Sequence, residues 1–191
     1  MPLVTDIVRS YRSPRPVFNG LLSRGADDKS GLVFLMLAMG IGFVSQLPGV
    51  ARRANTRDPE LDAAIMAERG DVRPIEGTEV PDGLVDAKFQ LFISSELTIW
   101  FLILPLALYG VAMLGHLALR AFGQKPDTTA SRLALFWALL VATPLKLLHG
   151  LVLGLIGTGP ALTLVGAMWF ALLMWNWTMN LRAAAAANSA A

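Results

Sequence analysis

The stretch that decides the fold covers residues 97–119 and reads LTIWFLILPLALYGVAMLGHLAL. It contains no acid, lysine or arginine. It is also longer than the roughly 20 residues that a helix needs to cross a bilayer core about 30 Å thick. Its apolar residues do not alternate with polar ones, as they would in a strand of a membrane barrel. The stretch therefore predicts a transmembrane helix.

Three other stretches are similarly apolar. Together the apolar runs predict spans at residues 31–50, 89–119, 133–156 and 161–181, and hence an all-α bundle of four transmembrane helices. The 191 residues are 54% hydrophobic and 16% charged, whereas an average soluble domain has about 25% charged residues. We expect one small multi-pass membrane protein with no separate catalytic domain.

Several classes of site are excluded by composition. Cysteine is absent, which rules out disulfides and cysteine metal centres, and only His116 and His149 could offer imidazole ligands. A net charge of +2 gives no case for nucleic acid binding. The four spans hold no aspartate, so the aspartate pair of some intramembrane proteases is missing. The sequence predicts no enzymatic activity, no cofactor and no metal.

Residues 1–30 form a basic, amphipathic N-terminal segment. Its apolar residues recur at helical spacing: Leu3, Val4, Ile7, Val8 and Tyr11. Arginines lie around this apolar face, at Arg9, Arg12 and Arg15. Two prolines, Pro14 and Pro16, interrupt the helix. A helix of this kind can lie on an anionic membrane surface. It can equally pack against its own bundle, and the sequence leaves both alternatives open.

The polar segment 51–88 is expected to hold one short helix. Asp58 is suited to cap its N-terminus, Pro59 to occupy its first position and Gly70 to stop it. Residues 71–86, rich in proline, glycine and acids, are expected to form an irregular loop. The low-complexity tail 183–191 is expected to be disordered.

Small and amide side chains mark predicted contacts between helices. They are Ala38 and Gly42, Gly150 and Gly154, and Asn176 and Asn180, each pair four residues apart. Small residues at this spacing let two helix backbones approach closely. The contacts can be intramolecular or can form a face for a second copy or another membrane protein. Pro105 is expected to kink the second span and to free a carbonyl near Phe101.

Three ionisable residues lie at predicted membrane depth. Glu96 is near the outer end of the second span, and Lys146 and His149 share one face of the third. Charged groups in a membrane are costly and usually face a partner or water. A Glu96–Lys146 pair near His149 is therefore a candidate binding site or polar path. The alternative is a purely structural role.

Positive charge sets the expected orientation. The termini and the loop between the second and third spans carry nine basic residues: Arg9, Arg12, Arg15, Arg24, Lys29, Arg120, Lys125, Arg132 and Arg182. The long loop carries six: Arg52, Arg53, Arg57, Arg69, Arg73 and Lys88. The more basic side tends to be cytoplasmic, so both termini are expected there, although Arg52 and Arg53 argue the other way.

The chain resembles small bacterial members of the Yip (Ypt-interacting protein) domain family. The resemblance rests on PLALYG at residues 105–110 with His116, SRLALFW at residues 131–137 and PLKLLHG at residues 144–150. The chain has four predicted spans where eukaryotic members have five, and it lacks their Asp-Leu-Tyr-Gly-Pro motif. The resemblance implies a non-enzymatic protein of the bacterial inner membrane, often oligomeric, that acts through protein partners or membrane lipids.

Two functions are expected on this basis. The first is a structural or interaction role, either as an accessory subunit of a larger membrane complex or as an organiser of lipids. The second is a small transporter or channel, with Glu96, Lys146 and His149 lining a polar path.

Overall fold

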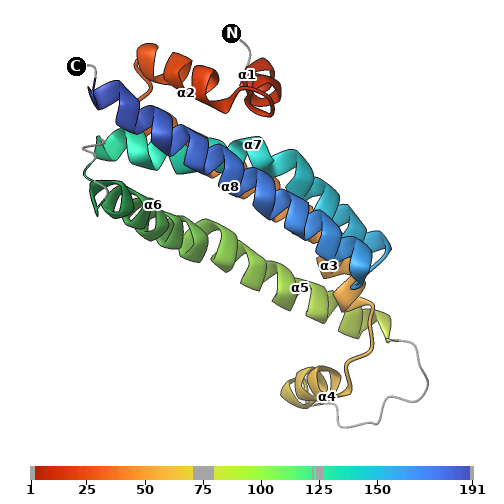
Figure 1. Cartoon of the computed structure of the whole chain (residues 1–191). Helices are drawn as coiled ribbons and strands as arrows, with labels where there is room; N and C mark the ends of the chain where they lie inside the picture. Colours follow the sequence, from red (N-terminus) through yellow and green to blue (C-terminus); the bar gives the residue numbers. More distant parts are fainter. Residues whose placement is uncertain (1–2, 71–79, 122, 124–126, 190–191) are drawn as a thin grey trace.

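The computed structural model describes residues 3–70, 80–121, 123 and 127–189, and all regular structure within these ranges is helical. The elements are α1 (Leu3–Ser10), α2 (Pro14–Ser23), α3 (Asp28–Ala54), α4 (Pro59–Glu68), α5 (Asp82–Thr98), the π-helical turn η1 (Ile99–Ile103), α6 (Leu104–Ala121), α7 (Thr128–Leu155) and α8 (Pro160–Ser189). Figure 1 shows α3, α7 and α8 in the middle of the bundle, α1 and α2 on one side, and the α5–α6 helix on the other.

The prediction of four membrane-length helices is confirmed. Four helical segments of the described chain are long and apolar enough to cross a membrane: α3, the continuous helix through α5, η1 and α6, α7, and α8. The observed helices are longer than the predicted apolar spans, because polar residues at their ends are also helical. Asp27 caps α3 by accepting the Ser30 backbone N–H, and Asp127 caps α7 in the same way through Ala130.

Two boundaries differ from those expected. Residues 183–189 were expected to be disordered, but α8 continues to Ser189, and Ala183 and Ala184 are buried. Alanine has the highest helix propensity, and here it also packs against the bundle. Helix α5 begins at Asp82, inside the segment expected to be an irregular loop. Residues 71–79 and 190–191, where the rest of those predictions fall, lie outside the described residues.

Helices α3 and α7 run in the same direction and touch along their length. A side chain at Gly150 would overlap the carbonyl oxygen of Ser45, and one at Gly154 would overlap Pro48. Near the other end, a Cβ on Gly31 would lie 3.4 Å from the Phe136 ring. Small residues are needed because lipid offers helices little hydrophobic reason to associate, so close van der Waals contact must supply it. The Gly150–Gly154 pair thus packs within the chain.

The prolines perturb the helices locally. Pro144 has no N–H, so it cannot bond the Leu140 carbonyl one turn earlier, and the Thr143 hydroxyl donates to that carbonyl instead at 2.8 Å. Ahead of Pro105 the backbone widens into the π-turn η1, where the Leu104 N–H bonds the Ile99 carbonyl. The predicted irregularity in the second span therefore takes the form of a π-turn.

The core is built around the first half of α7. From residue 130 to residue 143 every α7 side chain except Arg132 is buried, including the large rings of Phe136 and Trp137. This half of α7 contacts α3, α6, α8 and α1. Phe18 of α2, itself fully buried, belongs to the same apolar cluster. Beyond Pro144 the apolar residues of α7 are largely exposed, as expected for a surface that meets lipid acyl chains.

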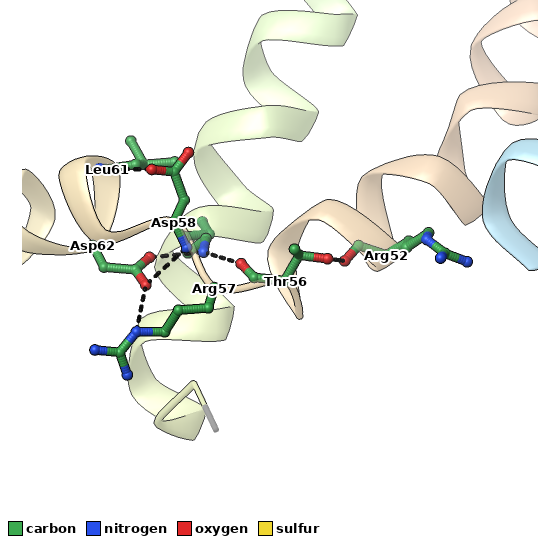
Figure 2. Close-up of polar contacts among 7 residues, drawn as sticks. Arg52, Thr56, Arg57, Asp58, Leu61 and Asp62 are labelled. Carbon is green, nitrogen blue, oxygen red and sulfur yellow. Dashed lines mark hydrogen bonds and ion pairs between the residues drawn. The ribbon is translucent and has the colours of Figure 1, made fainter. Parts of the chain in front are cut away.

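A buried ion pair attaches α4 to the start of α5. The Lys88 ammonium lies 2.7 Å from an Asp62 carboxylate oxygen and 2.7 Å from the Thr56 carbonyl, and both charged side chains are at most 1% exposed. Figure 2 shows the same Asp62 carboxylate reached by Arg57 and by the Asp58 backbone N–H. As predicted, Asp58 caps α4, and Gly70 follows its end at a positive φ of 74°.

The first prediction concerns the contact between α3 and α7. We expect Gly150→Ala to lower the free energy of unfolding by about 1–3 kcal/mol or more, because the methyl group overlaps backbone and the helices must separate. Gly40→Ala in α3 is the control, since nothing lies within 4 Å of its added Cβ. Thermal unfolding in mild detergent measures both. Equal melting temperatures for the two variants would contradict this packing.

The second prediction concerns α4. Lys88→Met leaves Asp62 buried without its nearest cation, a change that costs about 3–5 kcal/mol in comparable pairs. Because α4 contacts the bundle chiefly through α5, we expect α4 to detach while the bundle stays folded. Hydrogen exchange should accelerate in residues 59–68 and remain slow in α7. Lys88→Met/Asp62→Leu should restore protection; slow exchange of α4 in the single variant would refute the role of the pair.

Candidate functional site

Glu96 projects from α5 toward the end of α3. One carboxylate oxygen accepts from Arg53 at 2.8 Å, and the other accepts from the Trp100 indole N–H at 3.1 Å. The Glu96 side chain is 15% exposed. The sequence suggested Lys146 as the partner of Glu96, but the ion pair in the structure is with Arg53. Packing of α3 against α5, which the sequence does not specify, selects that partner.

Lys146 lies between two tryptophans. Its ammonium is 5.6 Å from the centre of the Trp100 ring and 5.5 Å from that of Trp169 on α8. Among the described residues no carboxylate lies within ion-pair distance of this ammonium. The ring faces supply partial negative charge, worth about 2 kcal/mol when desolvated. Trp100 therefore touches both charged residues, Glu96 through its N–H and Lys146 through its ring face.

His149 follows Lys146 by one helical turn and packs on α8. A Cβ on Gly166 would lie 3.4 Å from the His149 ring, so this glycine makes room for the imidazole. Its Nδ1 is buried without a hydrogen-bond partner among the described residues. Lys146 and His149 thus both reach α8, Lys146 at Trp169 and His149 at Gly166, while Glu96 is paired with Arg53.

Three arginines near the end of α3 each bind a different element. Arg52 donates to the Gly154 and Leu155 carbonyls at the C-terminus of α7, at 3.3 and 3.4 Å. Arg53 binds Glu96, and Arg57 lies 3.8 Å from Asp62. A cation at the C-terminal end of a helix also offsets the partial negative charge there. From the sequence, these arginines were considered only as charges that bear on orientation.

The remaining polar residues of the spans hold the other half of the bundle. Asn180 donates across to the Ala134 carbonyl of α7 at 3.2 Å, whereas Asn176 donates within α8 to Leu172. His116 is only 6% exposed, and its Nδ1 lies 3.3 Å from the Ser131 hydroxyl. These contacts join α6 and α8 to the central helix α7.

Helices α1 and α2 form a hairpin docked on the bundle. Trp137 of α7 donates its indole N–H to the fully buried Ser10 hydroxyl at 3.1 Å, and Ser10 donates to the Asp6 carbonyl. The Tyr11 hydroxyl donates to the Val141 carbonyl at 2.9 Å. The sequence left two alternatives open for this segment, the membrane surface and its own bundle. In the structure the segment packs against its own bundle. An apolar face alone does not show which surface a helix will pack on. Here the polar residues Ser10 and Tyr11 were the sequence signal for packing against the bundle.

Docking divides the predicted apolar face of α1. Leu3, Ile7 and Tyr11 turn toward the core, but Val4 and Val8 stay 68% and 59% exposed. Two apolar valines therefore remain on the outer surface of a helix whose other side is already packed.

An open, basic groove lies between α1 and α2. It has a volume of about 1030 Å³, and its lining includes Arg9, Arg12 and Arg24. The one acid in its lining, Asp6, is paired with Arg24 at 2.9 Å. A smaller depression of about 340 Å³ adjoins Arg12 and Arg15 and reaches Trp175 of α8. The arrangement suits an anionic group with an apolar part.

Neither protein-family models, nor curated proteins, nor solved structures gave a match to this chain. The resemblance to the Yip family therefore stays a prediction from the sequence. Within the described residues no group of three or more histidines, aspartates and glutamates is arranged to hold a metal ion.

The third prediction follows from Tyr11. Burial raises the pKa of its phenol above the ordinary value of about 10. An undocked phenol then ionises at lower pH than a docked one, so Tyr11 favours docking below the undocked pKa and ceases to do so as the pH rises through the docked value. Of the two tyrosines in the chain, Tyr109→Phe leaves only Tyr11. Ultraviolet absorbance should then titrate above pH 10; a midpoint at the ordinary value would contradict docking.

Proposed function

We propose that this chain is a non-enzymatic membrane protein that acts through contacts made by its N-terminal hairpin with membrane lipids or a neighbouring membrane protein. The observation that carries the proposal is the division of the hairpin into two faces. A buried polar contact at Ser10 and a partly buried one at Tyr11 fix one face to α7, while Val4, Val8 and Arg12 stay on the outside. A fixed surface that combines apolar and basic groups suits the binding of lipid or protein better than catalysis.

The proposed setting is the inner membrane of a bacterium, with both termini in the cytoplasm. The excess of arginine and lysine at the termini and in the α6–α7 connection supports it. Arg52 and Arg53 favour the opposite orientation. We give them less weight, because Arg52 binds the α7 carbonyls and Arg53 binds Glu96. The hairpin then belongs to the cytoplasmic half of the bundle. The resemblance to the Yip family agrees with a role as an accessory subunit or lipid organiser.

Transport is the second candidate, and one observation favours it. Lys146 is a cation in a membrane-length helix with no carboxylate partner in the described structure, and His149 lies one turn away. Against it, Glu96 is engaged by Arg53 and Trp100 covers Lys146. If transport is the function, wild-type protein in liposomes must carry a flux that Glu96→Gln/Lys146→Met abolishes; absence of any wild-type flux removes this candidate.

The fourth prediction tests the proposed function. Tagged full-length protein, extracted with its native lipids into nanodiscs, should carry a protein or lipid component at fixed stoichiometry by native mass spectrometry. Ser10→Val/Tyr11→Phe removes the two polar contacts with α7 and should release that component, because its binding surface is no longer held. The matched control, Ser94→Val/Tyr109→Phe, removes the same groups from sites away from the hairpin and should retain it.

Two results would overturn the proposal. One is a wild-type protein that carries no component at all. The other is equal retention by the anchor variant and the control, provided that both remain folded by thermal unfolding, since the hairpin would then not be the contact surface.

A further inference from the structure

We infer that the groove between α1 and α2 binds one anionic phospholipid, with the phosphate at Arg12 and an acyl chain along Val4 and Val8. The inference rests on the proposed function and names the ligand class of the same surface. Three independent features carry it: the depth of the hairpin in the bundle, its unpaired positive charge, and its exposed valines.

The hairpin reaches well along the membrane-spanning part of α7. Tyr11 bonds the carbonyl of Val141, and the apolar run of α7 begins at Leu133. Eight residues of helix rise about 12 Å, so the turn between α1 and α2 lies beside α7 roughly that far along its apolar run. The hairpin is therefore held against the apolar part of α7, beside the surface that we expect lipid to cover.

Arginines lie close to this turn. Arg12 and Arg15 are exposed, and neither makes a side-chain ion pair or hydrogen bond with another residue of the described chain. A guanidinium at membrane depth is expensive unless an anion accompanies it. The protein supplies a single acid in the groove, Asp6, and Arg24 already occupies it. Among the described residues of the groove no free acid is left for Arg12, so a bound anion would supply its counter-charge.

Lipid phosphate is the anion that fits this place. The planar guanidinium donates two parallel hydrogen bonds to phosphate oxygens, and Arg12 has all its donors available among the described contacts. A volume of about 1030 Å³ is at the upper end of ordinary ligand sites and accommodates a headgroup with the first part of its chains.

The apolar residues of the groove favour a lipid over a free inorganic anion as its ligand. Val4 and Val8 are more than half exposed on α1, and Val8 and Val17 line the groove itself. An inorganic phosphate would leave these valines unused, whereas the acyl chains of a phospholipid cover them. The arrangement thus selects an amphiphile with a negative head.

The fifth prediction tests this ligand. Full-length protein in nanodiscs containing equal parts of phosphatidylglycerol and phosphatidylcholine should retain phosphatidylglycerol after release into native mass spectrometry. Arg12→Gln/Arg15→Gln should lower that retention by about tenfold or more, because charge-assisted hydrogen bonds to the phosphate are lost. Lys29→Gln/Arg182→Gln has the same change in net charge at other exposed positions and should retain the lipid.

A second variant addresses the acyl contact. Val4→Ser/Val8→Ser keeps every arginine and should also lower retention of phosphatidylglycerol. Protein free of lipid in detergent should gain no thermal stability from inorganic phosphate alone. Stabilisation by inorganic phosphate equal to that by phosphatidylglycerol would overturn the lipid assignment in favour of a free-anion site.

Equal retention of phosphatidylglycerol by wild type and Arg12→Gln/Arg15→Gln would overturn the site altogether. That failure is distinct from failure of the proposed function. A protein component lost only in Ser10→Val/Tyr11→Phe would leave the proposed function in place, even if the lipid were retained by every variant.

Discussion

The close approach of α3 and α7 is the constraint on which the other contacts depend. Gly150 and Gly154 place the backbone of α7 directly against Ser45 and Pro48, and no larger side chain fits there. Apolar side chains are as well solvated by lipid as by each other, so a membrane bundle needs such close contact to hold its helices together. Once the two helices meet, the arginines that end α3 are near the C-terminus of α7 and near α5.

The first half of α7 becomes central for the same reason. With α3 along one side, α6 and α8 cover others, and Trp137 is left to face the N-terminal hairpin through its indole N–H. Several polar groups in the spans then have a local partner: Glu96 binds Arg53, Lys146 contacts two indole rings, and Asn180 donates to a backbone carbonyl of α7. In the hairpin, by contrast, the exposed Arg12 and Arg15 side chains make no ion pair with another residue of the described chain.

Much of the fold could be predicted from the sequence, because length and hydropathy alone determine how many helices can cross a bilayer. The cap of α4 at Asp58 was equally readable, since capping is local chemistry. The partners of the polar side chains could not be predicted in the same way. Glu96 was expected beside Lys146 on counts of depth, but the rotation of α5 against α3 turns it to Arg53. Likewise, the apolar face of α1 could have met either lipid or the bundle, and the part of it beside the contact between Ser10 and the distant Trp137 is the part that packs.

The central claim is that the N-terminal hairpin is part of the bundle. The most direct measurement is amide hydrogen exchange of the full-length protein in nanodiscs of zwitterionic lipid alone, where electrostatic attraction of arginines to the membrane surface is absent. A docked hairpin predicts that residues 3–23 exchange slowly there, with Ser10 and Tyr11 among the protected amides, close to the rates in the first half of α7. Exchange of residues 3–23 at the rates of an unfolded chain would contradict the account.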